Sequence, residues 1–496
     1  MRSGPGQMAF ARSAQHGRAA RVASVMFMGC PPFAGSPGII GQLRDAVRHY
    51  PAPVAAIREG SRMAGLSPIA APSRCGSFLI FPSGAGIARR AIGSVMRSTI
   101  CLRLLCLVSC SAVAWPLPAS ETPSVGQQRE DVLFWSQAEH TARFSRMYEI
   151  FPADRVDHGA HVHALPQGAA LTPQWNDGST TLAGYMTTHH LAGVLVLQHG
   201  RIRLQRHAPG FDDSTRWTSF SVAKSVTSTL LGIALRRGDI RGMDDTLDTY
   251  IPQLRDSAYA KVTVEQLLTM TSGVRWNEDY ADPHSDVAQM YRAACENGQA
   301  HVISYLAKLP RAYPAGTHWN YNTAETDLLG ILVQRATKQS LAAYLSQAIW
   351  KPYGMASDAY WLKDECDGSD TGGSGLSATL ADYGRIGQFM LDGGKIGGQP
   401  VIAEAWMHGA MRKQQDVDSP GHGYGYLWWT DTDGSYAAIG IYGQMVYVDP
   451  ARQLVIVQVG AWPQATSKEL VAARRDFVDA VKRAVDVPPA MAVSAR

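Results

Sequence analysis

A serine and a lysine three residues apart are the first residues in this sequence whose types and spacing could perform covalent catalysis. Ser221 and Lys224 lie in the stretch WTSFSVAKSVTSTLLGIALRRG, from Trp217 to Gly238. Residues three apart share one face of a helix, so the two side chains are expected to lie within reach of each other. A lysine that is partly removed from water has a lowered pKa and can accept the proton of a hydroxyl group. The pair therefore predicts a serine nucleophile that is activated by a lysine.

The elements around this pair must position it, and the stretch is typical of a buried helix. The polar, helix-capping residues Thr218 and Ser219 come first, apolar residues follow at helical spacing, and Gly238 ends the pattern. The free N–H groups and the positive dipole end of the helix would then surround Ser221. The same letters also fit a plain helix with a capping serine and an exposed lysine. The assignment therefore depends on what the rest of the chain supplies.

Composition limits the class of protein. The chain has 496 residues, of which 46% are hydrophobic and 18% are charged, so it can bury a full core and is not disordered. The net charge of +4 is small for this length, and much of the basic excess lies in the first hundred residues. No nucleic-acid partner is expected, and a small molecule is favoured.

The N-terminal region differs from the remainder. Residues 1–95 show no sustained helical or strand periodicity, so no fold is predicted for them. They are either upstream sequence that is not translated in vivo or a long transit-like presequence. Residues 96–114 are typical of a secretory signal that begins at Met96 and is cleaved after Ala114. An alternative is a lipobox that places a lipid on Cys110, the one route by which we expect a membrane partner. The mature protein is expected to be periplasmic or secreted.

Cysteine usage predicts no metal site. Of the seven cysteines, only Cys295 and Cys366 lie beyond residue 114. They are expected to be unpaired and buried, with a disulfide in an oxidising periplasm as the alternative. No cofactor is expected.

The remaining pattern predicts an α/β (α+β) fold in which an antiparallel sheet is flanked by helices and carries an inserted helical lobe. Residues 115–190 form an N-terminal extension, 191–238 plus 372–486 a sheet-and-helix lobe, and 239–371 the helical lobe. The predicted strands and helices are a hairpin over 191–207, helices over 264–270, 286–296, 324–336, 341–350 and 378–391, strands over 424–430, 436–440, 444–448 and 454–459, and a last helix over 468–484. A cleft between the lobes is the expected place for a small-molecule site.

A proton donor for the leaving group is also needed. Tyr321 follows a Pro-Ala-Gly-Thr turn and precedes a predicted helix. Beside a protonated Lys224, its pKa would be lowered and it could act as acid and base. The alternative is that Tyr321 has no catalytic role and only packs against other aromatic residues.

The order of several short motifs resembles the serine hydrolases of the class C β-lactamase and penicillin-binding-protein type, and within them the 6-aminohexanoate-dimer hydrolase branch of amidases and esterases. The motifs are Ser221-x-x-Lys224, LLTMTSG from Leu267 to Gly273, PAGT from Pro314 to Thr317, Tyr321-x-Thr323, Gly375-Leu376-Ser377, and GIYGQ from Gly440 to Gln444. The resemblance covers residues 132–484. It implies a β-lactamase/transpeptidase-like fold.

The resemblance also implies roles. Ser221 would be the acylated nucleophile, Lys224 its activating partner and Tyr321 the proton relay, while the backbone N–H groups of Ser221 and Gln444 would form the oxyanion hole. Gly443 would let the strand approach the substrate.

Two departures from the class C pattern change the expected substrate. Thr323 stands in the place of an asparagine, and Ile441-Tyr442-Gly443 replaces Lys-Thr-Gly. Because that lysine would bind a carboxylate, a neutral ester or amide is favoured over a β-lactam.

Candidate substrate-binding residues are Gly443, Tyr442, Thr323, Trp276 and Asp286, and further candidate pocket walls are Tyr280, Tyr424 and Trp428. The main hypothesis is a serine hydrolase that cleaves a small ester or amide. Its rivals are a low-activity class C-type β-lactamase or D,D-peptidase, and an inactive binding protein on the same fold. The sequence predicts no oligomeric state.

Overall fold

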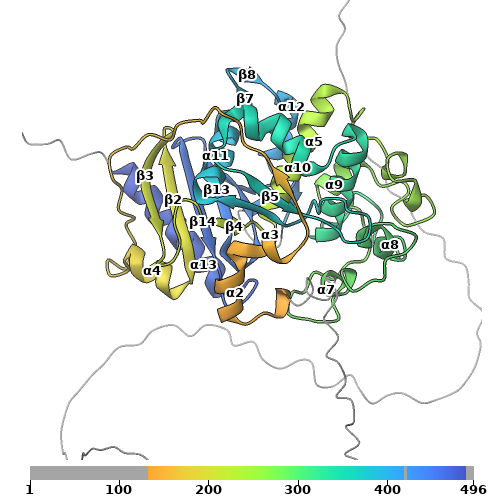
Figure 1. The fold of residues 1–496 in the computed structure, drawn as a ribbon, viewed down its shortest axis with the longest axis horizontal. Helices are drawn as coiled ribbons and strands as arrows, with labels where there is room; N and C mark the ends of the chain where they lie inside the picture. Colours follow the sequence, from red (N-terminus) through yellow and green to blue (C-terminus); the bar gives the residue numbers. More distant parts are fainter. Residues whose placement is uncertain (1–131, 418–421, 488–496) are drawn as a thin grey trace, which may run out of the picture. The chain divides into compact units, whose positions relative to one another are not determined.

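An eight-stranded antiparallel sheet organises the computed structural model, which describes residues 132–417 and 422–487 (Figure 1). Its strands lie in the order β3-β2-β14-β13-β12-β11-β10-β9. Their bounds are β2 Leu191–Gln198, β3 Arg201–His207, β9 Gln415–Asp416, β10 His422–Tyr424, β11 Trp429–Asp431, β12 Tyr436–Ile439, β13 Met445–Asp449 and β14 Leu454–Gly460. The two ends of the predicted sheet-and-helix lobe therefore meet in one sheet, as the sequence indicates.

Side-chain alternation gives this sheet two different faces. Val446 and Val455 face helix α11 (Leu380–Leu391), because a methyl group on Gly387 of that helix would touch both valines. Met445 and Tyr447 alternate with Val446 and face the opposite side, where they share a cavity with helix α13 (Lys468–Asp486). One face is thus closed by packing and the other is partly hollow.

A second sheet of four strands was not predicted. Its order is β1-β5-β6-β4, with bounds β1 Ala153–Val156, β5 Ala359–Leu362, β6 Leu376–Thr379 and β4 Arg216–Thr218. The residues expected to form a surface extension provide β1, which pairs with β5 over Ala153↔Leu362 to Val156↔Ala359. The short, polar sequence Ala-Asp-Arg-Val has no apolar alternation, so it gave no strand signal.

Helices and short turns fill the rest of the described chain, and no described helix is both long enough and apolar enough to span a bilayer. The other α-helices are α2 Gln137–Arg143, α3 Met147–Ile150, α4 Leu182–Thr188, α5 Val222–Arg237, α6 Val264–Leu268, α7 Asp286–Met290, α8 His301–Leu306, α9 Thr323–Thr337, α10 Leu341–Leu345 and α12 Glu404–Ala410. Short 3₁₀ turns cover Val132–Phe134, Phe144–Arg146, Leu247–Thr249, Pro252–Leu254 and Ile441–Gly443. A two-stranded ribbon pairs β7 Lys395–Ile396 with β8 Gln399–Pro400. Helix α5 packs on α9, which places the Ser-Lys pair against the helical region.

Several predicted elements differ from those observed. The helix predicted over 286–296 ends at Met290, and α8 was missed. The helix predicted over 341–350 gives way after Leu345 to a π-helical segment, Ser346–Gly354, which contains Pro352. The strand predicted over 424–430 is a hairpin of β10 and β11, and Leu427 between them has φ +60°.

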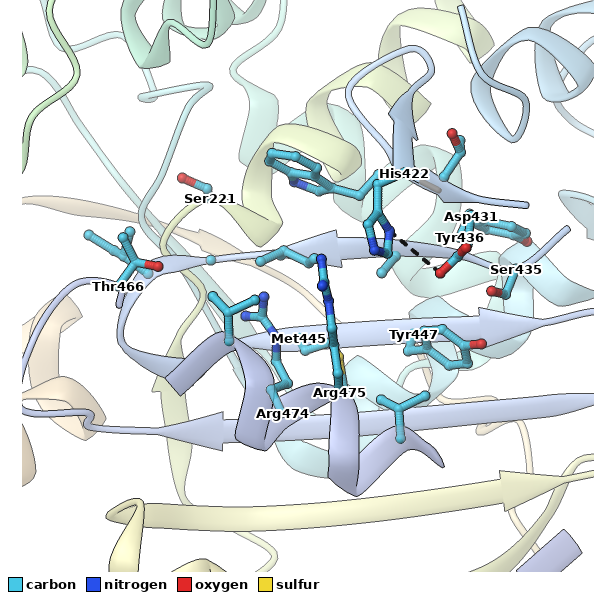
Figure 2. Close-up of a pocket in the computed structure, with 18 of the residues that line it drawn as sticks. Ser221, His422, Asp431, Ser435, Tyr436, Met445, Tyr447, Thr466, Arg474 and Arg475 are labelled. Carbon is cyan, nitrogen blue, oxygen red and sulfur yellow. Dashed lines mark ion pairs between the residues drawn. The ribbon is translucent and has the colours of Figure 1, made fainter. Parts of the chain in front are cut away.

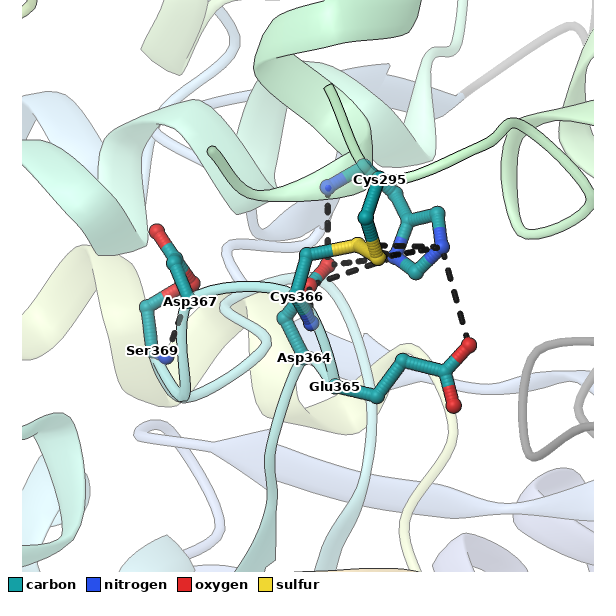
Figure 3. Close-up of a disulfide and its surroundings, with 7 residues drawn as sticks. Cys295, Asp364, Glu365, Cys366, Asp367 and Ser369 are labelled. Atoms are coloured by element: carbon teal, nitrogen blue, oxygen red, sulfur yellow. Dashed lines mark hydrogen bonds and ion pairs between the residues drawn. A yellow bond between two sulfur atoms is a disulfide. The ribbon is translucent and has the colours of Figure 1, made fainter. Parts of the chain in front are cut away.

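The expectation that Cys295 and Cys366 are unpaired was wrong, because the two residues form a disulfide across 71 positions of the chain (Figure 3). The bond ties the segment after α7 to the loop after β5. Spacing alone carried no sign of this approach, because it depends on the tertiary fold. Residues 1–95, the predicted signal at 96–114 and Cys110 lie outside the described residues.

Candidate active site

Ser221 lies at a strained turn that joins β4 to α5. The preceding residue, Phe220, has φ +43°, a region that side chains other than glycine rarely adopt. Its ring is held between Phe144 and Tyr442, at centroid distances of 4.9 and 5.1 Å. Ser221 is the N-cap of α5 but makes no side-chain capping bond. The hydroxyl is therefore not committed to the helix backbone, although the helix end surrounds it.

Lys224 contacts Ser221 as the sequence predicted. Its Nζ lies 2.9 Å from Ser221 Oγ, 3.0 Å from Thr323 Oγ1 and 2.8 Å from the carbonyl oxygen of Gly373. Burial lowers the pKa of Lys224 to about 8, against the opposing effect of the Glu278 and Asp327 carboxylates. A substantial fraction of the amine is thus neutral just above neutral pH, the form that can accept the Ser221 proton.

Tyr321 lies in the same cavity as Ser221, on the loop before α9. Its ring centroid is 5.2 Å from Lys224 Nζ, and the ring stacks on Trp429 at 5.9 Å. The prediction that Lys224 lowers its pKa was wrong: burial, followed by the charge of Glu278, raises the pKa of Tyr321, and a hydrogen bond with Ser221 only partly opposes them. The phenol therefore stays protonated and is suited to donate a proton.

Glu278 is a site residue that the sequence reasoning missed. Its carboxylate accepts hydrogen bonds from the Thr323 backbone N–H at 3.0 Å and from the Tyr280 hydroxyl at 2.8 Å, and also from Thr323 Oγ1 and Trp276 Nε1. Thr323 Oγ1 thereby connects Glu278 to Lys224. A single acid in an aperiodic loop gives no sequence signal.

The structure brings Gly440, rather than Gln444, against the nucleophile. A Cβ on Gly440 would lie 2.5 Å from Ser219 O and 3.1 Å from Ser221 N. The next residue, Ile441, lines the cavity with Ser221 and begins a 3₁₀ turn, so the turn makes no use of its N–H.

Gln444 does not line that cavity, although its Cβ would lie 3.1 Å from a Cβ on Gly440. It is buried, and its side chain bonds to Gly460, with Nε2 2.7 Å from the Gly460 oxygen and Oε1 3.0 Å from the Gly460 nitrogen. The better-placed oxyanion donors are the N–H groups of Ser221 and Ile441.

Two other predicted binding residues in the GIYGQ motif point elsewhere. The Tyr442 hydroxyl donates to the carbonyl of Leu133 at 3.0 Å, and its ring packs on Phe144 and Phe220. Gly443 has φ +97° and lies under Trp462, where a Cβ would be 2.7 Å from the indole nitrogen. Both residues shape the loop and do not line the cavity.

Asp286 and Trp276 are also placed outside the cavity. The Asp286 carboxylate accepts from both terminal nitrogens of Arg275 at 3.1 and 3.2 Å, from the Asn277 N–H at 2.8 Å and from the Tyr305 hydroxyl at 2.7 Å. Trp276 is buried and binds Glu278 through its indole N–H. Both residues act as supports for the loop that carries Glu278.

Ser221 lies where two hollows meet. The larger is a cavity of about 690 Å³ between the sheet and α13 (Figure 2). Its lining includes Ser221, Glu278, Tyr280, Tyr321, His422, Trp429, Thr430, Asp431, Ser435, Tyr436, Ala437, Ile439, Gly440, Ile441, Met445, Tyr447, Trp462, Ala465, Thr466, Val471, Arg474, Arg475, Val478, Asp479 and Lys482. The smaller, about 80 Å³, has mainly apolar walls and shares Ser221, Tyr280 and Ile441 with the larger.

The remaining predicted walls lie as follows. Thr323 lines the smaller hollow, and Tyr280 lines both. Tyr424 packs against Tyr321 with ring centroids 6.2 Å apart, so it holds the ring of a residue that lines the cavity. Trp428 is fully buried against Tyr436.

One group within residues 132–417 and 422–487 has the donor types for a metal ion, and it lies apart from Ser221. Cys295, His301 and Cys366 bring their donor atoms within 4.8 Å of one another. The two sulfurs are joined as the disulfide, and a disulfide sulfur is not the thiolate that binds metals.

Comparison with known proteins agrees with this geometry. The sequence profile of the Beta-lactamase family matches residues 179–478. The chain is 28% identical over 372 residues to the 6-aminohexanoate-dimer hydrolase of Paenarthrobacter ureafaciens, a match that covers 71% of this chain and 93% of that protein. It is 31% identical over 185 residues to Esterase EstB of Burkholderia gladioli, which covers 33% of this chain and 45% of the esterase.

A solved structure shows the same fold. It comes from Bacillus anthracis, is provisionally assigned as a 6-aminohexanoate-dimer hydrolase, and superimposes with a TM-score of 0.63 at 24% identity, over 70% of this chain and 95% of that chain. The expected β-lactamase/transpeptidase-like fold is therefore confirmed. With the profile match over more than half of its length, the chain belongs to the Beta-lactamase family and is a serine hydrolase.

Proposed function

We propose that this protein hydrolyses a small ester or amide in two steps through an acyl-enzyme on Ser221. The observation that carries the proposal is the buried contact of 2.9 Å between Lys224 Nζ and Ser221 Oγ at the mouth of two hollows. A nucleophile within hydrogen-bond reach of its base is the geometry that covalent catalysis requires.

In the first step the neutral Lys224 amine takes the Ser221 proton while Oγ forms a bond to the substrate carbonyl carbon. The N–H groups of Ser221 and Ile441 face the developing oxyanion. The proton then passes from Lys224 through the Tyr321 hydroxyl to the leaving oxygen or nitrogen, and the bond from the carbonyl carbon to that atom breaks. Water next attacks the Ser221 ester, and the reverse proton transfers restore the free serine and release the acid.

The relatives favour an ester or amide over a β-lactam. One is named a 6-aminohexanoate-dimer hydrolase and another an esterase. At the place of the cationic Lys-Thr-Gly motif this chain has Ile441-Tyr442-Gly443, and the Tyr442 side chain is turned into the core.

The test compares wild type with Ser221→Ala on 4-nitrophenyl esters, a linear amide and the chromogenic cephalosporin nitrocefin. Ester or amide turnover that is lost in Ser221→Ala supports the proposal. Equal turnover in both proteins would overturn the mechanism. Nitrocefin turnover faster than ester turnover would favour the β-lactamase alternative, and an inert but folded wild type would favour the binding-protein alternative.

We also propose that the protein is exported from the cytoplasm. The Cys295–Cys366 disulfide supports this proposal, because such bonds persist mainly in oxidising compartments. Mass spectrometry of the N-terminus of the secreted or periplasmic protein tests it. A start after residue 114 is expected, a lipidated Cys110 would support the lipoprotein alternative, and recovery of the protein only from the cytoplasm would overturn export.

A further inference from the structure

Arg474 is a cation on the wall of the large cavity whose charge the proposed catalytic steps do not use. It lies in α13, the residue is 8% exposed, and it shares the cavity with Ser221. Figure 2 shows the side chains of Arg474 and Arg475 rising from α13 into the cavity. Arg474 was not among the predicted site residues, because the only cation expected to bind a substrate carboxylate was the lysine of the Lys-Thr-Gly motif, which this chain lacks.

Among the described residues, the Arg474 charge has no carboxylate partner. Burial lowers the pKa of Arg474 to about 10, Tyr185 opposes this shift, and the neighbouring Arg475 adds to it. The guanidinium therefore stays protonated at neutral pH. Over residues 132–417 and 422–487 no carboxylate forms an ion pair with Arg474, and the partial compensation of its charge comes from the phenol of Tyr185. A buried charge without a counter-ion is costly, and such charges are normally paired.

Several other ionisable groups around the cavity have partners. Lys482 lies 2.7 Å from Asp433, and His422 lies 3.5 Å from Asp431. Near the nucleophile, the Glu278 carboxylate is engaged by its four hydrogen-bond donors. Asp479 lines the same cavity, but within residues 132–417 and 422–487 neither it nor another carboxylate forms an ion pair with Arg474. Arg474 is therefore charged and buried without a paired carboxylate.

Packing holds the guanidinium of Arg474 in place. Its Cζ lies 5.4 Å from the centroid of Trp462, which also lines the cavity. A guanidinium over an aromatic face is oriented by it and can still offer its fork of N–H groups to a planar carboxylate.

The lining of the cavity that Arg474 shares with Ser221 is largely apolar. Strands β12 and β13 supply Ala437, Ile439 and Met445, and α13 supplies Val471 and Val478. A hydrocarbon segment could lie along such a wall, whereas a chain of polar groups would lose its hydration there.

We propose that Arg474 binds a carboxylate carried by the substrate, at the far end of an apolar segment whose reacting carbonyl lies at Ser221. The inference rests on the proposed function and sharpens it, because the substrate becomes an anionic ester or amide in place of the neutral one that the missing lysine suggested. The cation is supplied by the last helix of the fold and not by the strand motif beside the nucleophile.

Two matched substrate pairs test the proposal, one for each side of the scissile bond. The acyl pair is mono-4-nitrophenyl hexanedioate and its methyl ester, and the leaving-group pair is 4-(hexanoyloxy)benzoate and its methyl ester. For each pair the measured quantity is the ratio of kcat/KM for the carboxylate to kcat/KM for the methyl ester. We expect Arg474→Met to reduce this ratio for one pair by about 10- to 100-fold, because hydrogen bonds to charged groups are lost. The kcat/KM for the neutral methyl ester should change less than about threefold, and Arg474→Lys should restore part of the ratio.

The control is Arg483→Met, which removes a guanidinium of the same helix that does not line the cavity and donates to Gln174 O. It should leave both ratios unchanged. Equal ratios in wild type and Arg474→Met would overturn the carboxylate site while leaving the Ser221 mechanism intact, since neutral esters would still be cleaved.

A binding measurement separates this inference from the failure of catalysis. Calorimetry of monomethyl hexanedioate and of 4-hydroxybenzoate with Ser221→Ala should show binding of at least one, and this binding should weaken by about 10-fold or more in Ser221→Ala/Arg474→Met. Retained binding in the double variant, or no binding to Ser221→Ala, would contradict the proposal even if no ester were cleaved.

Discussion

Replacing Gly440 by alanine tests the close approach between the end of β12 and the nucleophile. The new Cβ would lie 2.5 Å from Ser219 O and 3.1 Å from Ser221 N, and Cβ atoms essentially never approach other heavy atoms within 3.0 Å. The two backbone segments must therefore separate by about 0.5 Å or more, which misplaces the Ile441 N–H relative to Ser221. A misplacement near 1 Å at a reacting centre can cost about 100-fold, and loss of one oxyanion donor costs about 100- to 1,000-fold in kcat. We expect kcat for 4-nitrophenyl esters to fall by about 10- to 100-fold.

The assay is steady-state ester hydrolysis together with thermal unfolding. Gly242→Ala is the matched control, because a Cβ at Gly242 would meet nothing within 4 Å. Its kcat should equal that of wild type. The reasoning would be refuted if Gly440→Ala kept kcat within about threefold of wild type, or if both alanine variants lost activity alike.

Three further predictions concern the lysine, its acidic neighbour and the disulfide. Because burial lowers the pKa of Lys224 to about 8 and its neutral form is the base, kcat/KM should rise with pH and level off above about pH 8; a profile flat from pH 6 to 10 would contradict this role. Glu278 raises the pKa of Lys224, so Glu278→Gln should move the rising limb of that profile to lower pH, whereas a shift to higher pH would show that its charge does not act on Lys224. The double variant Cys295→Ser/Cys366→Ser opens a loop of 71 residues and should lower the free energy of unfolding by about 4 kcal/mol in denaturant titrations, with an unchanged midpoint contradicting a structural role for the bond.

The elements with strong local patterns were the ones that the sequence predicted well. The hairpin at 191–207 and the helix that ends at Gly238 have long apolar runs or clear periodicity, and both are present. Strand β1 is short and polar, and the Cys295–Cys366 pairing depends on tertiary contacts. Neither leaves a periodic signal in one sequence.

In the candidate site, too, the residues that were predicted correctly are those set by local spacing in the sequence. Ser221 and Lys224 were predictable because a fixed spacing on one helix forces them together. The predicted donor Gln444 was four residues from the observed close approach at Gly440, since motif order does not specify which residue of a loop faces the nucleophile. Glu278 and Arg474 come from a loop and from the last helix, and only the fold brings them to the cavity of Ser221.

Covalent labelling tests the central claim most directly. A fluorophosphonate probe should add one label to the wild-type protein, and peptide mass spectrometry should locate it on Ser221. Lys224→Ala should label much more slowly, and Ser221→Ala should not label at all. A label on another residue, or equal labelling of wild type and Ser221→Ala, would contradict the account of Ser221 as the nucleophile.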